Sequence, residues 1–149
     1  MIVRLMPEQI SGFWSLIKTG VIDIGGRISP GNWDYSNNVF NRCLAGLLQV
    51  WLCAEEVDSK PEFKGFFITA IDIDPISEER TLSIQTIYVM KNPSKELYQE
   101  AKQRIEDYAK ANSCKVVTIM TDVGHREKLV EEVWPDVKKK TLFIIPVRK

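Results

Sequence analysis

The chain has 149 residues, of which 44% are hydrophobic and 27% are charged, as in an ordinary globular domain that buries its own core. Its 20 lysine and arginine residues balance its 20 aspartate and glutamate residues, so the net charge gives no reason to expect binding to nucleic acid or to an anionic membrane. No apolar run approaches the ~20 residues of a membrane span, and the N-terminal stretch lacks the apolar core of a signal peptide. We therefore expect a single domain over residues 1–149 in a reducing cytoplasm.

The N-terminal part of the chain predicts one strand and two helices. Ile2–Leu5 is a short apolar stretch typical of a strand. A helix follows from Pro7, with apolar residues at i, i+3, i+4 and i+7, and Gly20 is expected to end it. The stretch GGRISPGNWD, residues 25–34, contains three glycines and a proline and predicts a loop. A second helix begins after it, with Ser36 as its cap.

Three β-type segments occupy the middle of the chain, at residues 48–55, 64–74 and 81–90. They are rich in β-branched and aromatic residues, and turn-forming residues separate them. Short turns of this kind join antiparallel neighbours, so we expect a meander.

The last part of the chain predicts two helices and two strands. An amphipathic helix begins at Ser94, followed by a strand at 115–121, a short helix at 129–134 and a final strand at 139–147. The long helix acts as a crossover that places strand 115–121 parallel to strand 81–90.

The predicted order is therefore β-α-α-β-β-β-α-β-α-β, and the fold class is α/β (α+β). A single mixed, mainly antiparallel sheet flanked by helices is the economical packing of these elements. A ferredoxin-like sandwich is the alternative, and it requires a different placement of the helices.

Three cysteines, Cys43, Cys53 and Cys114, lie far apart, and none belongs to a CxxC pair. All three have apolar neighbours in sequence, where free cysteine usually acts as a small core residue. We predict neither a disulfide framework nor a metal site, and we favour a structural role over a nucleophilic one.

From residue 87 through the helix to strand 115–121, the sequence resembles the GNAT (Gcn5-related N-acetyltransferase) family, and the element order extends the likeness over nearly the whole chain. In that family the fourth strand ends in an apolar-x-Val pattern, here Ile87-Tyr88-Val89, and a loop and the acetyl-CoA helix follow. The next strand splays from the fourth to admit the pantetheine arm. The residues that the resemblance assigns to cofactor binding are Tyr88, Val89, Lys91, Ser94 and Lys95.

The loop before that helix departs from the family pattern. The family holds the pyrophosphate on an Arg/Gln-x-x-Gly-x-Gly/Ala loop, whereas Met90–Lys95 contains no glycine and Pro93 removes one N–H donor. A helix N-terminus capped by Ser94 remains, with Lys91 and Lys95 nearby, and it attracts an anion less specifically. We favour the simpler interpretation of Ser94 as a plain N-cap.

Candidate catalytic groups are few. Family members often carry an acidic tyrosine on the last helix, and Val130 takes that place here. Asp72 and Asp74 are the candidate bases for an amine, although carboxylates at a strand end before a turn are also typical of turn chemistry. Gln85 lies where some members have an acidic residue, and it cannot act as a base.

In the resembled fold, the loop at residues 25–34 forms one wall of the acceptor site. Arg27, Trp33, Asp34 and Tyr35 are residue types that line recognition surfaces, and we predict that they contact the acceptor or a partner protein. A connector whose aromatic residues fold back on the core is the equal alternative.

The opening MPEQISGFWSLIK is similar to the first helix of small GNAT-like proteins of tailed bacteriophages, some of which are virion components. Together with the missing glycine loop, this favours a non-catalytic interaction protein or virion-associated protein, which implies a protein partner and a location in the virion or the host cytoplasm. The alternative is an acetyl-CoA-dependent N-acetyltransferase with an atypical pyrophosphate loop. The apolar run Leu142–Ile145 is either a central strand or an edge that pairs with a second chain as a homo-oligomer.

Overall fold

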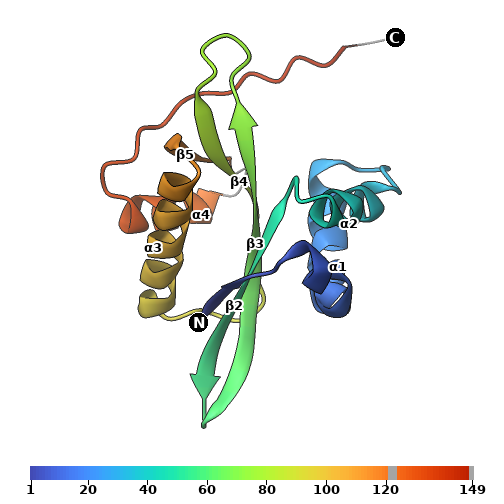
Figure 1. Ribbon diagram of the computed structural model, residues 1–149, viewed down its shortest axis with the longest axis vertical. Coiled ribbons are helices and arrows are strands. Elements are labelled where there is room, and N and C mark those ends of the chain that lie inside the picture. Colours follow the sequence, from blue (N-terminus) through green and yellow to red (C-terminus); the bar gives the residue numbers. More distant parts are fainter. Residues whose placement is uncertain (121–123, 148–149) are drawn as a thin grey trace.

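The computed structural model describes residues 1–120 and 124–147 (Figure 1). The helices are the 3-10 helix η1 (Pro7–Gln9) and the α-helices α1 (Ile10–Ile28), α2 (Tyr35–Leu44), α3 (Lys95–Ala111) and α4 (Gly124–Val133). The strands are β1 (Ile2–Arg4), β2 (Gln49–Val57), β3 (Lys60–Ile73), β4 (Arg80–Val89) and β5 (Cys114–Ile119). Within this described part, no helix combines the length and the apolar content needed to traverse a bilayer.

One mixed sheet with the strand order β1-β2-β3-β4-β5 organises the fold. Strands β1 to β4 are antiparallel neighbours, and β5 runs parallel to β4 because α3 carries the chain back along the sheet. Helices α1 and α2 lie on one side of the sheet, and α3 and α4 lie on the other (Figure 1). The predicted fold class, the meander and the parallel crossover are confirmed.

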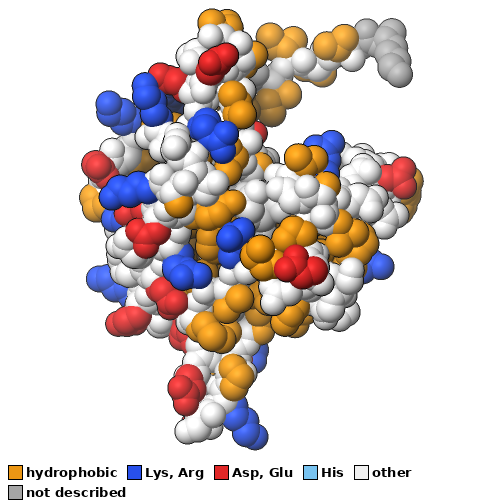
Figure 2. Space-filling model, viewed as in Figure 1, with side chains coloured by type: hydrophobic (Ala, Val, Ile, Leu, Met, Phe, Trp, Pro, Cys, Tyr) orange, Lys and Arg blue, Asp and Glu red, His pale blue; other side chains and the backbone are white. Residues whose placement is uncertain are grey.

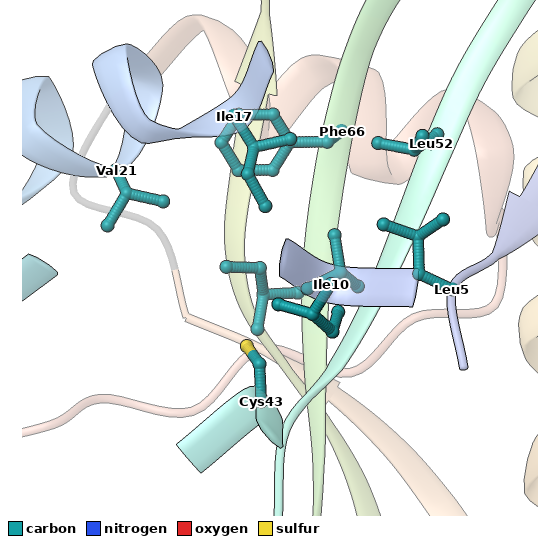
Figure 3. Close-up of a cluster of buried hydrophobic side chains, with 9 residues drawn as sticks. Leu5, Ile10, Ile17, Val21, Cys43, Leu52 and Phe66 are labelled. Atoms are coloured by element: carbon teal, nitrogen blue, oxygen red, sulfur yellow. The ribbon is translucent and has the colours of Figure 1, made fainter. Parts of the chain in front are cut away.

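Two apolar cores, one on each face of the sheet, hold the layers together. Side chains alternate between the two faces along β2 and β3, so Leu52 packs toward α1 while Trp51 packs toward α3. The first core contains Leu5, Ile10, Ile17, Val21, Cys43, Val50, Leu52, Phe66 and Ile68 (Figure 3). The second contains Ile2, Trp51, Phe67, Leu82, Ile84, Leu97, Ile105 and Ala109. The three cysteines are free, and Cys43 is a core residue as predicted.

Helix α1 is longer than predicted. It continues past Gly20 to Ile28, so the following loop begins at Ser29 instead of residue 25. Gly20 is buried, and a Cβ atom there would come within 2.7 Å of the rings of Phe66 and Tyr88. The glycine permits close contact between the helix and the sheet, and the expectation that it ends the helix is wrong.

The predicted final strand is absent from the described residues. Residues 138–147 form neither helix nor strand, and they extend away from the body of the domain (Figure 1). A strand needs a partner edge for its N–H and C=O groups, and none of the described backbone hydrogen bonds gives this segment one. The predicted order is therefore confirmed up to α4, and its last strand is wrong.

Candidate functional site

Strands β4 and β5 pair over only the first part of β4. The register joins Arg80–Ile84 to Cys114–Ile119, and β4 then continues through Gln85–Val89 without a partner on β5. Backbone N–H and C=O groups on that side of Gln85–Val89 therefore face the space between the two strands. This opening is the first element of the candidate site.

A β-bulge in β4 marks the start of the opening. Ile68 pairs with Thr86 and Thr69 pairs with Ile84, so Gln85 is an extra residue on β4. A bulge bends a strand and increases its twist, so β4 changes direction where its pairing with β5 ends. The exposed Gln85 side chain donates a hydrogen bond through Nε2 to Oγ of Ser83 at 2.8 Å.

Three adjoining cavities follow the opening from one side of the sheet to the other. The first, of about 270 Å³, lies between α1, α2 and the sheet. The second, of about 60 Å³, shares Gln85 and Thr86 with the first cavity and Ile119 and Val130 with the third, which has about 80 Å³. We call the three together the cross-sheet groove, because they link the α1/α2 side of the sheet with the α3/α4 side.

The third cavity is a mainly apolar slot between β4, α3 and α4. Ile87, Leu97 and Val130 represent the three elements in its wall. Burial raises the pKa of the Cys53 thiol to about 12, and burial also raises the pKa of the Tyr98 phenol. Both groups in the wall are therefore protonated at neutral pH, and the slot suits an uncharged flexible arm.

The first cavity is more polar than the third. Tyr35 begins α2 and packs on Gly25 of α1, where a Cβ atom would collide with its ring. Burial raises the pKa of Tyr35, and a side-chain hydrogen bond with Thr86 partly offsets that increase. Arg42 of α2 lies at the exposed rim of this cavity. A hydroxyl and a cation thus meet the space in which a second substrate fits.

The residues predicted as acceptor contacts divide into two groups. Tyr35 lines the first cavity and Arg27 lines the second, where Arg27 also forms an ion pair with Asp23 at 3.5 Å. Trp33 is 92% exposed and Asp34 is exposed, and neither lines the cross-sheet groove. The structure therefore brings two of the four predicted residues to the groove.

The N-terminus of α3 is occupied by side chains of the protein itself. Ser94 Oγ accepts a hydrogen bond from the Leu97 amide at 3.1 Å, so Ser94 is the predicted N-cap. The Ser94 amide in turn donates to Glu55 Oε1 at 2.6 Å. Glu62, which is the cross-strand partner of Glu55, lies 3.3 Å from the ammonium group of Lys91. One amide and one cation that the resemblance assigned to the pyrophosphate thus already bind carboxylates.

These carboxylates are charged at neutral pH. Hydrogen bonds from Ser94 lower the pKa of Glu55, and hydrogen bonds from Lys64 and Lys91 lower the pKa of Glu62. Two like charges directly across an antiparallel pair repel each other, and these donors offset the repulsion. The loop before α3 therefore presents negative charge next to the slot.

Comparisons with known proteins give structural matches only. No family model matches the chain, and no curated protein matches it by sequence. An aminoglycoside acetyltransferase from an uncultured soil metagenomic sample is 12% identical at a TM-score of 0.71, over 100% of this chain and 96% of that one. A ribosomal-protein-alanine N-acetyltransferase from Brucella melitensis biovar Abortus 2308 is 15% identical at a TM-score of 0.66, over 99% of each chain. A predicted acetyltransferase from Clostridium acetobutylicum, solved with acetyl-CoA, is 15% identical at a TM-score of 0.67, over 97% and 95%.

The chain has the GNAT fold. Because the identities are only 12% and 15%, the likeness establishes the fold, and the activity has to be argued from the site. Within the GNAT fold, the opening between β4 and β5 corresponds to the splayed strands that the resemblance predicted. A phage origin stays a prediction.

The two candidate bases lie away from the groove of this GNAT fold. Asp74 accepts hydrogen bonds from the amides of Ile76 and Ser77 at 2.9 and 2.8 Å, and it thereby stabilises the turn between β3 and β4. Asp72 is exposed at the end of β3. Neither residue lines any of the three cavities, so the turn interpretation describes Asp74.

Some features of the site were not predicted from the sequence. Tyr88 and Val89 line the slot as predicted, and Val130 lines it at the position expected to lack the family's tyrosine. The roles of Glu55 and Glu62 were missed because they depend on the register of the β2–β3 hairpin. The adjacent charges at 55–56 and 62 in a β-type segment were the available signal.

Proposed function

We propose that the protein is an N-acyltransferase that uses a thioester of the pantetheine type, such as acetyl-CoA, and an amine acceptor. The observation that carries the proposal is the cross-sheet groove, which joins an apolar slot to a more polar cavity through an opening in the sheet. The three similar structures are all named as acetyltransferases, which supports this function over the non-catalytic role favoured by the sequence.

The groove gives each substrate a place. The arm of the donor lies in the slot along the unpaired edge of β4, where backbone groups of Gln85–Val89 can hydrogen bond to it. An N–H group held there in advance also stabilises negative charge that develops on a carbonyl oxygen. The acceptor enters through the first cavity, so the two substrates meet beside Thr86.

The proton transfers constrain the groups that act. The amine nitrogen bonds to the thioester carbon and the C–S bond breaks, so one proton leaves nitrogen and one reaches sulfur. No Asp or Glu of the described residues lines the groove, so the amine enters uncharged or loses its proton to water. Tyr35 is the hydroxyl group at the junction of the first two cavities, beside Thr86, and we assign it to protonation of the sulfur.

The carboxylates before α3 affect which part of the donor is recognised. Glu55 and Glu62 place negative charge near the helix N-terminus, where a pyrophosphate would otherwise bind. Like charges repel, so the affinity for the donor depends more on the arm in the slot than on its phosphates.

Calorimetric titration with acetyl-CoA tests the donor site. Val130→Trp fills the wall shared by the second and third cavities, whereas Ile76→Trp adds the same ring at an exposed turn. We expect micromolar binding by the wild type and by Ile76→Trp, and no binding by Val130→Trp. Absence of heat from the wild type at millimolar donor would refute the proposal.

A kinetic test addresses Tyr35. Tyr35→Phe removes the hydroxyl and keeps the ring that packs on Gly25. We expect kcat for CoA release with a reactive amine to fall by roughly 10²-fold, with an unchanged dissociation constant for the donor. An unchanged kcat would exclude Tyr35 as the acid without affecting the donor site.

A further inference from the structure

A contiguous run of apolar side chains near the C-terminus is exposed to solvent. Phe143, Ile144 and Ile145 are 82%, 82% and 83% exposed, and their neighbours Leu142 and Val147 are exposed as well. Figure 2 shows apolar side chains along this segment where it leaves the body of the domain. Single exposed apolar residues are ordinary, whereas contiguous ones mark an interaction surface. We call residues 141–147 the C-terminal segment.

The composition of the C-terminal segment is that of a strand buried on both faces. Threonine, phenylalanine, isoleucine and valine favour strands, and Leu142–Ile145 is apolar at every position instead of every second one. Such continuous runs are typical of central strands that are covered on both sides. In the structure the segment has neither a neighbouring strand nor a cover.

The sheet offers a free edge that fits a strand. Strand β5 ends the sheet, and within residues 1–120 and 124–147 no strand pairs with its outer edge. Val116, in the middle of β5, is 53% exposed. An edge of this kind presents unpaired N–H and C=O groups to any strand that approaches it.

Contacts with two helices hold the chain up to the start of the C-terminal segment. Trp134 Nε1 donates a hydrogen bond to Glu106 of α3 at 2.9 Å. Lys139 forms ion pairs with Glu127, at 3.0 Å, and with Glu131 of α4. Beyond Lys139 the chain runs outward past the hairpin of β3 and β4 (Figure 1). The segment is thus directed away from its own domain.

We propose that two copies of this chain exchange their C-terminal segments, each segment adding as a strand to the outer edge of β5 in the other copy. The exchange gives the segment the partner edge that it lacks in one chain, and it also pairs the edge of β5. Because each copy gives one segment and receives one, the assembly closes as a two-fold dimer. The added strand lies between two domains and has both faces covered, whereas an edge strand on its own domain would leave one face open.

The mass of the full chain in solution tests the exchange, measured by light scattering after size exclusion. Ile144→Asp places a charge within the segment, and Ile76→Asp makes the same change at an exposed turn. Both residues are exposed in one chain, so both variants keep the fold by circular dichroism. We expect dimers for the wild type and for Ile76→Asp, and monomers for Ile144→Asp.

Hydrogen exchange identifies which strands pair. Amides of residues 114–119 and 141–147 exchange slowly in the wild-type dimer and rapidly in the Ile144→Asp monomer. A wild-type monomer overturns the proposal, and a protected segment in that monomer assigns it to β5 of its own chain. A dimer that persists in Ile144→Asp also overturns it, because another surface then holds the copies together.

Discussion

Replacing Thr69 by valine tests how much a buried polar network stabilises the sheet. The Trp51 indole Nε1 donates a hydrogen bond to Thr69 Oγ at 3.0 Å, and the Thr69 hydroxyl donates to Gln49 Oε1 at 2.9 Å. Thr69 is 0% exposed and Trp51 is 2% exposed, so water does not replace the hydroxyl when it is removed. The network links β2 and β3 under α3, next to the wall of the slot.

The expected loss follows from the groups left without partners. Valine fills nearly the same volume as threonine, so no cavity forms, but the Trp51 N–H loses its acceptor and Gln49 Oε1 loses its donor. An unsatisfied buried polar group costs about 1–3 kcal/mol, and Gln49 is near enough to solvent to recover part of its share. The sum is about 2–4 kcal/mol, which lowers the Tm of a domain of this size by roughly 5–15 °C.

Urea unfolding followed by tryptophan fluorescence measures this loss, with Thr69→Ser as the matched control. Serine keeps the hydroxyl and loses one methyl group, which costs about 1 kcal/mol. Thr69→Val should therefore be less stable than Thr69→Ser at an unchanged m value. If the valine variant is as stable as the wild type, the network does not stabilise the fold and the reasoning is wrong.

Three further outcomes are expected. Glu55→Gln combined with Glu62→Gln should tighten binding of CoA, measured by calorimetry, and leave binding of a pantetheine thioester without phosphates unchanged; equal effects on both would refute the electrostatic argument. The pKa of Glu55 is lowered on folding by hydrogen bonds from Ser94, so its contribution to stability is present above the ordinary glutamate pKa of about 4.3 and is lost as the pH falls through the lower folded value. Urea midpoints of the wild type and of Glu55→Gln should therefore converge in acid, and a constant difference would contradict this. Gly65→Ala should cost about 2–4 kcal/mol in urea unfolding, because a methyl group there collides with the Tyr88 carbonyl oxygen, and a neutral result would show that β4 can shift.

The sequence predicts the elements whose stability is mainly local. The meander, the amphipathic α3 and its Ser94 cap follow from alternation, periodicity and capping, and all are confirmed. Helix α1 differs because its contact with β3 and β4 outweighs the low helix propensity of Gly20 and Gly25. The final strand differs because a strand also requires a partner, and composition alone does not supply one.

The candidate site is predicted only in part for a related reason. Tyr88 and Val89 reach the slot because they end a strand whose position the element order defines. The Glu55 contact with Ser94 joins residues 39 positions apart, and it depends on how the β2–β3 hairpin lies beside the loop before α3. Such long-range pairs require the register of the whole sheet, which one sequence does not contain.

The bulge at Gln85 has a consequence for how strand β4 divides its side chains between the two cores. Leu82 and Ile84 belong to the core under α3, and simple alternation would send Tyr88 to the same side. With one added residue the phase reverses, so Ile87 joins that core instead and Tyr88 stacks on Phe66 of the other. The length of β4, more than the identity of its residues, therefore decides which face the end of the strand presents. Deleting the single residue Gln85 would exchange the two sides of the slot wall, a change that no single substitution in β4 reproduces.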